Sequence, residues 1–520
     1  MSGPVIDSPN RNIEVASRYH NDTKHSWHSI HTDAHYLDWN NEPRSFKVYP
    51  GLEGQKLPTD LPASGVSALD ALVSKAIPER EFVPTRRDLA GLFYYSAGIT
   101  KRGTIPGGEI YFRAAACTGA LYHIELYLVC GDLPDLAAGV YHFGPHDFSL
   151  RQLRAGDYRG VLIEAASGEP AISQAPAVVV TSSVYWRNAW KYRARAYRHS
   201  YWDSGTILAN LLAVGNASQA PLKVVTSFMD SSVNQLLGLD DQWEAALQLV
   251  PMGCAPGLPT PTSPDVTPLH LEVSPYSYHE VSYPAIREMH VASSLVSPEE
   301  VPELWGNPPP TASTGPQGAI SPLTKASEAD LPAEAIESVI FRRGSSRRFR
   351  RASITFQQLS TMLERATQEI PADFLGGPGT TLNQLYLIAN DVEGLPSGSY
   401  VYHPEQKALE QLKEGNFREQ AGYLGLQQAL PADASVDVFF LSDLNAVLER
   451  YGNRGFRMAQ VEASIRGGKL YLAAYAQRLG ATGLTFFDDD VTQFFSPHAQ
   501  GKSVMFLVAL GRPQPRLRPQ

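Results

Sequence analysis

The spacing of apolar residues along this chain predicts a mixture of helices and strands. Leu359, Met362 and Leu363 share one face of a helix predicted over residues 356–366, and a similar helix is predicted over residues 89–98. Ala- and Leu-rich helices are expected over residues 203–216 and 465–479. Apolar runs of strand length cover residues 124–130, 382–389, 436–442 and 504–510. The pattern predicts an α+β fold with central, mainly antiparallel sheets flanked by helices.

A long-range repeat is the most informative pattern in the sequence. Tyr127 and Tyr386 begin similar segments and lie 259 positions apart, as do Gly139 and Gly398. The same shift relates the Tyr- and Arg-rich segments 192–198 and 451–457. Because the shift is far longer than a solenoid unit, each copy is expected to be a whole domain. The chain is therefore predicted to be a fused intrachain pseudo-dimer, compatible with a monomer in solution.

Prolines separate the two copies. They are frequent between residues 255 and 335, and such a stretch is not expected to hold a regular helix or a central strand. Four segments are predicted: an N-terminal leader (1–65), a first domain (66–254), a proline-rich linker (255–335) and a second domain (336–520).

The composition excludes some classes of binding partner. Of the 520 residues, 43% are hydrophobic and 19% are charged, as is usual for a globular protein. The net charge of −9 leaves no surplus of Lys and Arg for nucleic acid. No apolar run reaches the roughly 18 residues of a membrane span, and the first residues lack the pattern of a signal peptide. We therefore expect a cytoplasmic protein with no membrane and no nucleic-acid partner.

Cysteine and histidine spacing does not predict a metal site. Cys117, Cys130 and Cys254 are an odd number without metal-binding spacing and are expected to be reduced thiols. A group of histidines within residues 28–35 has no nearby carboxylate or cysteine pattern, so surface histidines are expected there.

An arginine- and serine-rich run opens the second copy. Arg342, Arg343, Ser345 and Arg347 carry guanidinium forks and a hydroxyl, which suit a phosphate. A solvated basic patch is the alternative interpretation of this run taken alone.

This run resembles the start of the nitroreductase-like fold, in which an Arg-Arg-Ser-x-Arg-x-Phe segment holds the phosphate of FMN. Residues 19–26, 37–39, 46–50, 92–100, 117–122 and 480–489 are similar to SagB/ThcOx-type dehydrogenases with tandem nitroreductase domains. These matches cover nearly all of the chain outside the linker. The resemblance implies two nitroreductase-like domains and an FMN-dependent oxidoreductase.

The resemblance also implies how the two copies share one flavin. In the family, one subunit supplies the phosphate-binding run, a Gly-rich loop and a C-terminal basic residue, and the other supplies a loop and a helix over the ring. Only the second copy has the arginine run, and its loop at residues 376–380 is the less similar one. One FMN site is therefore expected, in which the second copy binds the phosphate and the first copy covers the flavin ring. The further implied FMN-binding residues are Ala116, Cys117, Thr118, Gly119, Gly483, Leu484, Thr485 and Arg512. Cys117 is either a small packing residue or a reactive thiol beside the flavin.

A Lys-Tyr pair is the implied catalytic element. Lys191 and Tyr192 match a pair that, in azoline-oxidising relatives, assists proton removal while a hydride passes to flavin N5, and a desolvated lysine can act as a base. Charges on a solvated helix are the alternative. The implied substrate is a peptide thiazoline or oxazoline. Two other functions remain open: NAD(P)H-dependent reduction of small electrophiles, and a flavin-free scaffold that binds peptides.

Overall fold

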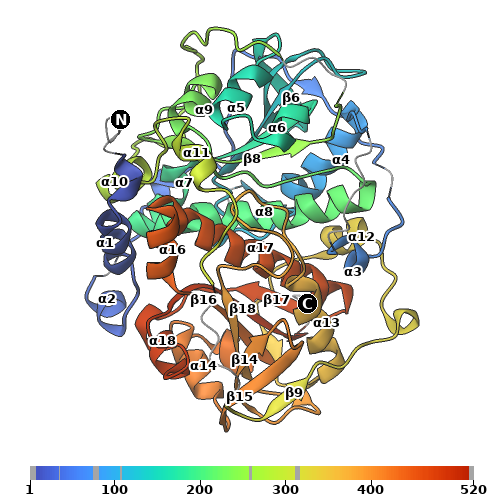
Figure 1. The fold of residues 1–520 in the computed structure, drawn as a ribbon, viewed down its shortest axis with the longest axis vertical. Coiled ribbons are helices and arrows are strands. Elements are labelled where there is room, and N and C mark those ends of the chain that lie inside the picture. The colour runs from blue at the N-terminus through green and yellow to red at the C-terminus, as the bar shows by residue number, and fades with distance from the viewer. Residues whose placement is uncertain are drawn as a thin grey trace, which may run out of the picture.

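Two sheets lie on either side of a central pair of long helices (Figure 1). The computed structural model describes residues 8–33, 35–61, 63–73, 81–105, 108–256, 261–310 and 317–514. The central helices, α8 (Ala196–Ser218) and α17 (Arg454–Ala476), pack side by side. The sheet of the first half lies above them in Figure 1 and the sheet of the second half lies below.

The first half is built on a six-stranded antiparallel sheet in the order β1-β6-β5-β4-β7-β8. Its strands are β1 (Gln55–Lys56), β4 (Ile124–Cys130), β5 (Gly139–Gly144), β6 (Ser149–Ala155), β7 (Ala177–Val184) and β8 (Glu244–Met252). A separate hairpin is formed by β2 (Ile99–Ile105) and β3 (Gly108–Arg113). Leu126 and Leu128 of β4 join one apolar cluster, and Tyr127 and Val129 join another, so the sheet is covered on both faces.

Helices cover this first sheet and the segments before it. They are α1 (Glu14–Asp22), α2 (Trp27–Thr32), α3 (Ala68–Ala71), α4 (Arg86–Ala97), α5 (Arg159–Ala165), α6 (Pro170–Gln174), α7 (Tyr185–Tyr192) and α9 (Asp230–Leu237). Short 3-10 helices are η1 (Pro9–Arg11), η2 (Trp39–Asn41), η3 (Thr118–Ala120) and η4 (Arg193–Arg195). The described part of the chain contains no helix that is both long enough and apolar enough to cross a bilayer.

The second half repeats this plan on an eight-stranded sheet. The order is β10-β18-β16-β12-β14-β15-β9, with β17 paired to β18, and all pairings are antiparallel. The strands are β9 (Ile320–Pro322), β10 (Phe349–Arg350), β12 (Gln384–Ala389), β14 (Gly398–His403), β15 (Ala408–Glu414), β16 (Val436–Ser442), β17 (Gly480–Gly483) and β18 (Ser503–Pro513). A small parallel pair is formed by β11 (Ile354–Thr355) and β13 (Val392–Glu393).

The helices of the second half and of the linker complete the fold. They are α10 (Pro284–Ala292), α11 (Glu300–Glu303), α12 (Ile336–Arg342), α13 (Phe356–Ala366), α14 (Arg418–Leu424), α15 (Ala429–Asp433), α16 (Leu444–Tyr451) and α18 (Asp488–Phe495), with the 3-10 helix η5 (Glu328–Asp330). The predicted α+β class with antiparallel sheets is confirmed. The expectation that residues 255–335 hold no regular helix was wrong, because α10 begins at Pro284, where the missing N–H would have no partner in any case.

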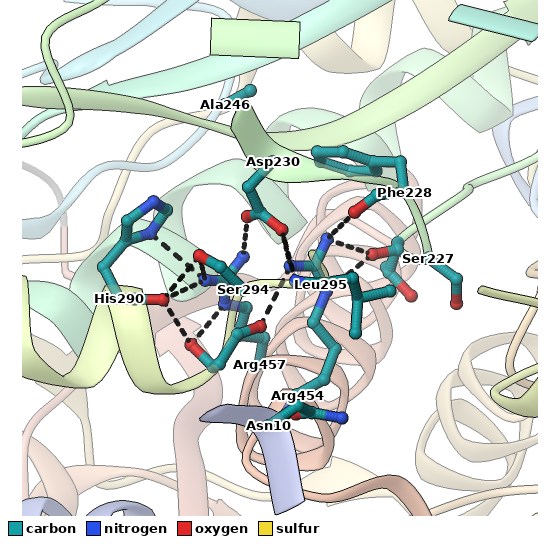
Figure 2. A network of polar contacts seen from close by, with 12 residues as sticks. Asn10, Ser227, Phe228, Asp230, Ala246, His290, Ser294, Leu295, Arg454 and Arg457 are labelled. Carbon is teal, nitrogen blue, oxygen red and sulfur yellow. Dashed lines mark hydrogen bonds and ion pairs between the residues drawn. The ribbon is translucent and has the colours of Figure 1, made fainter. Parts of the chain in front are cut away.

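Two crossed clusters of charge join the halves. Asp230, at the start of α9, accepts hydrogen bonds from Arg454 and Arg457 of α17, the latter at 2.6 Å (Figure 2). At the matching place, Asp488 at the start of α18 is bonded by two arginines near the start of α8, including Arg198 at 2.7 Å. Each carboxylate therefore belongs to one half and its guanidinium partners to the other.

A hydroxyl from the segment that precedes each copy accepts a hydrogen bond from one arginine of the corresponding cluster. The Nε of Arg198 donates to the hydroxyl of Thr23 at 2.9 Å, and the Nε of Arg457 donates to the hydroxyl of Ser293 at 2.8 Å. Thr23 follows α1 in the leader, and Ser293 follows α10 in the linker. Leader and linker thus occupy equivalent grooves, and the structural repeat extends into both.

Removing one carboxylate of these clusters is expected to destabilise the whole chain. Asp230→Asn should lower the free energy of unfolding by about 3–5 kcal/mol, because it leaves two buried arginines without their counter-charge. Denaturation in guanidinium chloride measures the loss. The matched control is Glu303→Gln, whose carboxylate pairs with Arg11 at the surface and should cost less than about 1 kcal/mol. Equal losses in the two variants would contradict this role of Asp230.

The same carboxylate predicts how stability depends on pH. Burial alone would raise the pKa of Asp230, but Arg454 and Arg457 hold it at about 2. Since an unfolded Asp titrates near pH ~3.9, the stabilisation is present above that pH and is lost as the pH falls toward 2. Unfolding midpoints measured from neutral pH down to about pH 3 should therefore fall less steeply for Asp230→Asn than for the wild type. Parallel curves would contradict the assignment.

Candidate active site

A cleft of about 430 Å³ lies between the two halves. The first half contributes the loop around η3, the end of α7 and one side of α8; the second contributes the segment after α12, the start of α15 and the loop after β17. Most of the residues predicted from sequence line this cleft. They are Ala116, Cys117, Thr118, Gly119, Lys191, Tyr192, Ser345, Arg347, Gly483, Leu484 and Thr485.

Two of the predicted arginines bind other parts of the protein. Arg342 pairs with Glu334 at 2.6 Å. Arg512, near the exposed end of β18, donates to the carbonyl of Ser353 at 2.8 Å. Neither side chain lines the cleft.

Arg343 lies behind the cleft wall. Its guanidinium is buried and donates to the backbone carbonyls of Ala114 at 2.7 Å and Arg113 at 3.0 Å. It therefore ties the second half to the strand and loop that lead into η3. Within the arginine run, Ser345 and Arg347 are the residues that reach the cleft.

Asp203 of α8 organises the loop over the cleft. Its Oδ1 accepts hydrogen bonds from the hydroxyl of Thr118 at 2.8 Å and from the Thr118 amide at 2.9 Å. Its Oδ2 accepts from the Cys117 thiol at 3.1 Å and lies 2.9 Å from His123 Nε2. Sequence reasoning missed Asp203 and His123. The available signal was a carboxylate within an apolar helix, because such a residue is rarely buried without a specific role.

Tyr192 and Gly119 meet on the same side of the cleft as this loop. Gly119 has a φ of 64°, and a Cβ there would come within 2.9 Å of the Tyr192 hydroxyl, so glycine is required on both grounds. Lys191 is half-buried and its Nζ lies 5.5 Å from the centre of the Tyr192 ring. Burial and the nearby Asp203 raise the pKa of Tyr192, which keeps its hydroxyl protonated.

The equivalent place in the other half is filled by the chain itself. Arg450 and Tyr451 are the counterparts of Lys191 and Tyr192, 259 positions later. Arg450 donates to the carbonyl of Glu303 at 2.8 Å, and the Tyr451 hydroxyl donates to that of Gly306 at 2.9 Å. The end of α11 and the residues after it therefore occupy the position that is open beside Lys191 and Tyr192.

The carboxylate of Asp373 also occupies this place in the second half. Asp373 accepts hydrogen bonds from the amide of Thr226 at 3.0 Å and from its hydroxyl at 3.1 Å. Thr485 is the counterpart of Thr226 by the same shift, and its Oγ1 is buried without a partner in the described part of the chain. An acceptor on a molecule bound in the open cleft would satisfy Thr485 as Asp373 satisfies Thr226.

The Cys117 thiol is expected to be unreactive. Burial and the Asp203 carboxylate raise its pKa well above the usual value, so it stays protonated and donates to Asp203. This favours a packing role over a reactive thiol. Peptide mapping after treatment with iodoacetamide at pH 8 should find Cys117 labelled much more slowly than the partly exposed Cys254. Rapid labelling of Cys117 would overturn the direction of its pKa shift.

Comparisons with known proteins agree with this architecture. Residues 340–512 match the sequence model of the Nitroreductase family. A candidate nitroreductase of Methanocaldococcus jannaschii is 25% identical over 169 residues, which are 32% of this chain and 85% of that protein. The crystal structure of a candidate nitroreductase from Anabaena variabilis matches with a TM-score of 0.74 and 25% identity, over 96% of this chain and 99% of that one. The second half of this chain therefore contains a nitroreductase-family domain, and the chain as a whole has the fold of a solved nitroreductase-like structure.

Proposed function

We propose that this protein is an FMN-dependent oxidoreductase that binds one flavin in the cleft between its halves. The observation that carries the proposal is the meeting of two sets of residues from opposite halves. Residues 116–119, Lys191 and Tyr192 face Ser345, Arg347 and residues 483–485 across one cleft. The family resemblance assigns both sets to the same FMN.

The chemistry of the cleft fits this cofactor. Arg347 is exposed at the wall and Ser345 is half-buried beside it, a pairing suited to a phosphate. The unpartnered Thr485 hydroxyl matches the carbonyl and ring-nitrogen acceptors of a flavin ring. A second flavin is not expected, because the chain fills the equivalent place with Asp373 and the residues after α11.

We also propose that the chain is an intrachain pseudo-dimer. In an isologous dimer, a residue on the two-fold axis meets its own copy. Gly205 of α8 lies against Ser464 of α17, and Ala209 lies against Gly468. Both pairs are 259 positions apart, so at both places a residue meets its own counterpart.

Bound FMN would supply two-electron hydride chemistry at N5. The protein would fix the geometry of the cleft: the carboxylate of Asp203 holds the loop at Cys117 and Thr118 in place. Tyr192 keeps its proton and can donate a hydrogen bond to a bound substrate. Lys191, at the same wall, is the group we assign to accept the proton that a substrate loses.

For the substrate we propose the oxidation of azolines to azoles in peptides, supported by Lys191 and Tyr192 at the cleft wall. NAD(P)H-dependent reduction of small electrophiles is the competing reaction. Anaerobic mixing separates them, since an azoline peptide alone should bleach the flavin band in the first case and NAD(P)H alone in the second. Lys191→Met should slow bleaching by the azoline peptide about 10²–10⁴-fold, the usual contribution of a general base. A rate unchanged in this variant would remove Lys191 from the reaction.

FMN retention tests the cofactor assignment directly. Arg347→Ala should weaken FMN binding at least about tenfold, because a charge-assisted hydrogen bond contributes roughly 1.5–3 kcal/mol. Quenching of flavin fluorescence measures the affinity. Arg350→Ala, an exposed arginine outside the cleft wall, is the matched control and should bind as the wild type does.

The same titration gives the stoichiometry, which should be one FMN per chain. Two FMN per chain would show that the filled place can open. Protein that shows no flavin absorbance and takes up no added FMN would exclude the oxidoreductase and favour the peptide-binding scaffold.

A further inference from the structure

Three side chains of different chemistry converge beside the cleft, and we propose that Cys117, His123 and Asp203 bind a divalent transition-metal cation of the zinc type. This inference goes beyond the proposed function and does not depend on it. One ligand atom from each residue, the thiol sulfur, an imidazole nitrogen and a carboxylate oxygen, lies within 4.8 Å of the other two. Sulfur, nitrogen and oxygen ligands in such a set are those that Zn²⁺ and Co²⁺ accept.

The distances between these atoms are close to those around a bound cation. Asp203 Oδ2 lies 3.1 Å from Cys117 Sγ and 2.9 Å from His123 Nε2. With bonds of about 2.0–2.3 Å, ligand atoms around tetrahedral Zn²⁺ are about 3.2–3.6 Å apart. Because the three atoms all lie within 4.8 Å of one another, side-chain movements alone would bring them to these separations.

Each ligand is already oriented by a further contact. The Thr118 hydroxyl donates to Oδ1 of Asp203 and the Thr118 amide contacts both carboxylate oxygens, so the carboxylate is held with Oδ2 facing the other two groups. The Ser183 hydroxyl lies 2.9 Å from His123 Nδ1, and the Tyr122 amide donates to Cys117 Sγ at 3.1 Å. Such outer contacts fix the tautomer of a ligating histidine and the direction of a ligating thiolate.

Asp203 lacks the direct cationic partner that its counterpart has in the second half. In the second half, the counterpart of Asp203 is Glu462, which forms a buried ion pair with Arg466. The counterpart of Arg466 in the first half is Ile207. Among the described residues, Asp203 has no ion pair with Lys or Arg. The guanidinium groups of Arg113 and Arg187 lie near His123, and Arg187 is paired with Glu125. The first half has therefore kept the buried carboxylate without the cation that balances it in the second half.

All three candidate ligands belong to the first half, which supplies the loop over the open cleft. The counterparts of Cys117 and His123 are Gly376 and Leu382, so the filled half has neither a thiol nor an imidazole here. Cys117 and Asp203 line the cleft, which leaves a path for the ion and a fourth position for a water or a bound molecule. Three protein ligands with one open position are typical of catalytic rather than structural zinc sites.

Binding has to displace the thiol proton. A coordinating thiol is deprotonated, so the cation competes with the thiol proton and affinity should increase with pH. The alternative is that the three groups only hydrogen-bond to one another, with no affinity for a cation.

Cobalt titration of the full-length protein separates these two states. After dialysis against a chelator, Co²⁺ should bind at one ion per chain and give a sulfur-to-cobalt charge-transfer band in the near ultraviolet, recorded as a difference against the same sample without cobalt. Cys117→Ser should remove that band. His123→Leu, which introduces the residue of the filled half, should weaken cobalt binding at least about tenfold. Cys130→Ser is the matched control, because Cys130 is a buried thiol elsewhere in the sheet and its loss should leave the band unchanged.

The outcome does not depend on flavin. FMN affinity and circular dichroism, measured on the same samples, report the fold and the proposed cofactor site separately. Wild-type protein that gives no charge-transfer band, or a band that survives in Cys117→Ser, would overturn the metal site even if FMN binds as proposed. A band that Cys117→Ser removes would support it even if FMN does not bind.

Discussion

The close contact between α8 and α17 is the constraint on which the rest of the molecule depends. Both helices are buried on nearly all sides, so their packing cannot rely on one apolar stripe. Small residues allow the approach: a Cβ on Gly468 would lie 2.5 Å from that of Ala209, and one on Gly205 would overlap the Ser464 side chain. Each of the two carboxylate–arginine clusters then ties one of these helices to the other half: α17 to α9 through Asp230 (Figure 2), and α8 to α18 through Asp488.

The two halves differ in what lies beside each central helix. Beside α17, the residues after α11 and Asp373 fill the space and satisfy Arg450, Tyr451 and Thr226. Beside α8, the corresponding groups of Lys191, Tyr192 and Thr485 face an open cleft. One place is therefore open to a bound molecule, and the other is filled by the chain's own packing. The linker contributes directly to this difference, since the residues after α11, which fill the place beside α17 together with Asp373, belong to it.

The wall of the open cleft is more rigid than a surface loop. The Asp203 carboxylate is hydrogen-bonded to Thr118, Cys117 and His123. Several hydrogen bonds to one carboxylate hold its partners in one arrangement. Arg343 supports the same region from the second half through two backbone carbonyls. Precise placement of a loop over a bound ring, or of ligands around a cation, requires this kind of support.

The sequence by itself indicated the repeat, the α+β class, four helices (α4, α8, α13 and α17), four strands (β4, β12, β16 and β18) and 11 of the residues that line the cleft. Repeats, apolar periodicity and short motifs can be recognised from the order of the residues alone. Three outcomes depended on tertiary structure. Arg343 turned away from the cleft, because buried carbonyls of the other half compete for its guanidinium. Asp203 and His123 joined Cys117, although 80 positions separate the first two. The second site closed, because proline-rich residues that predict no regular structure folded into it. Each of these depends on contacts between distant segments, and the spacing of residues along a chain carries no record of such contacts.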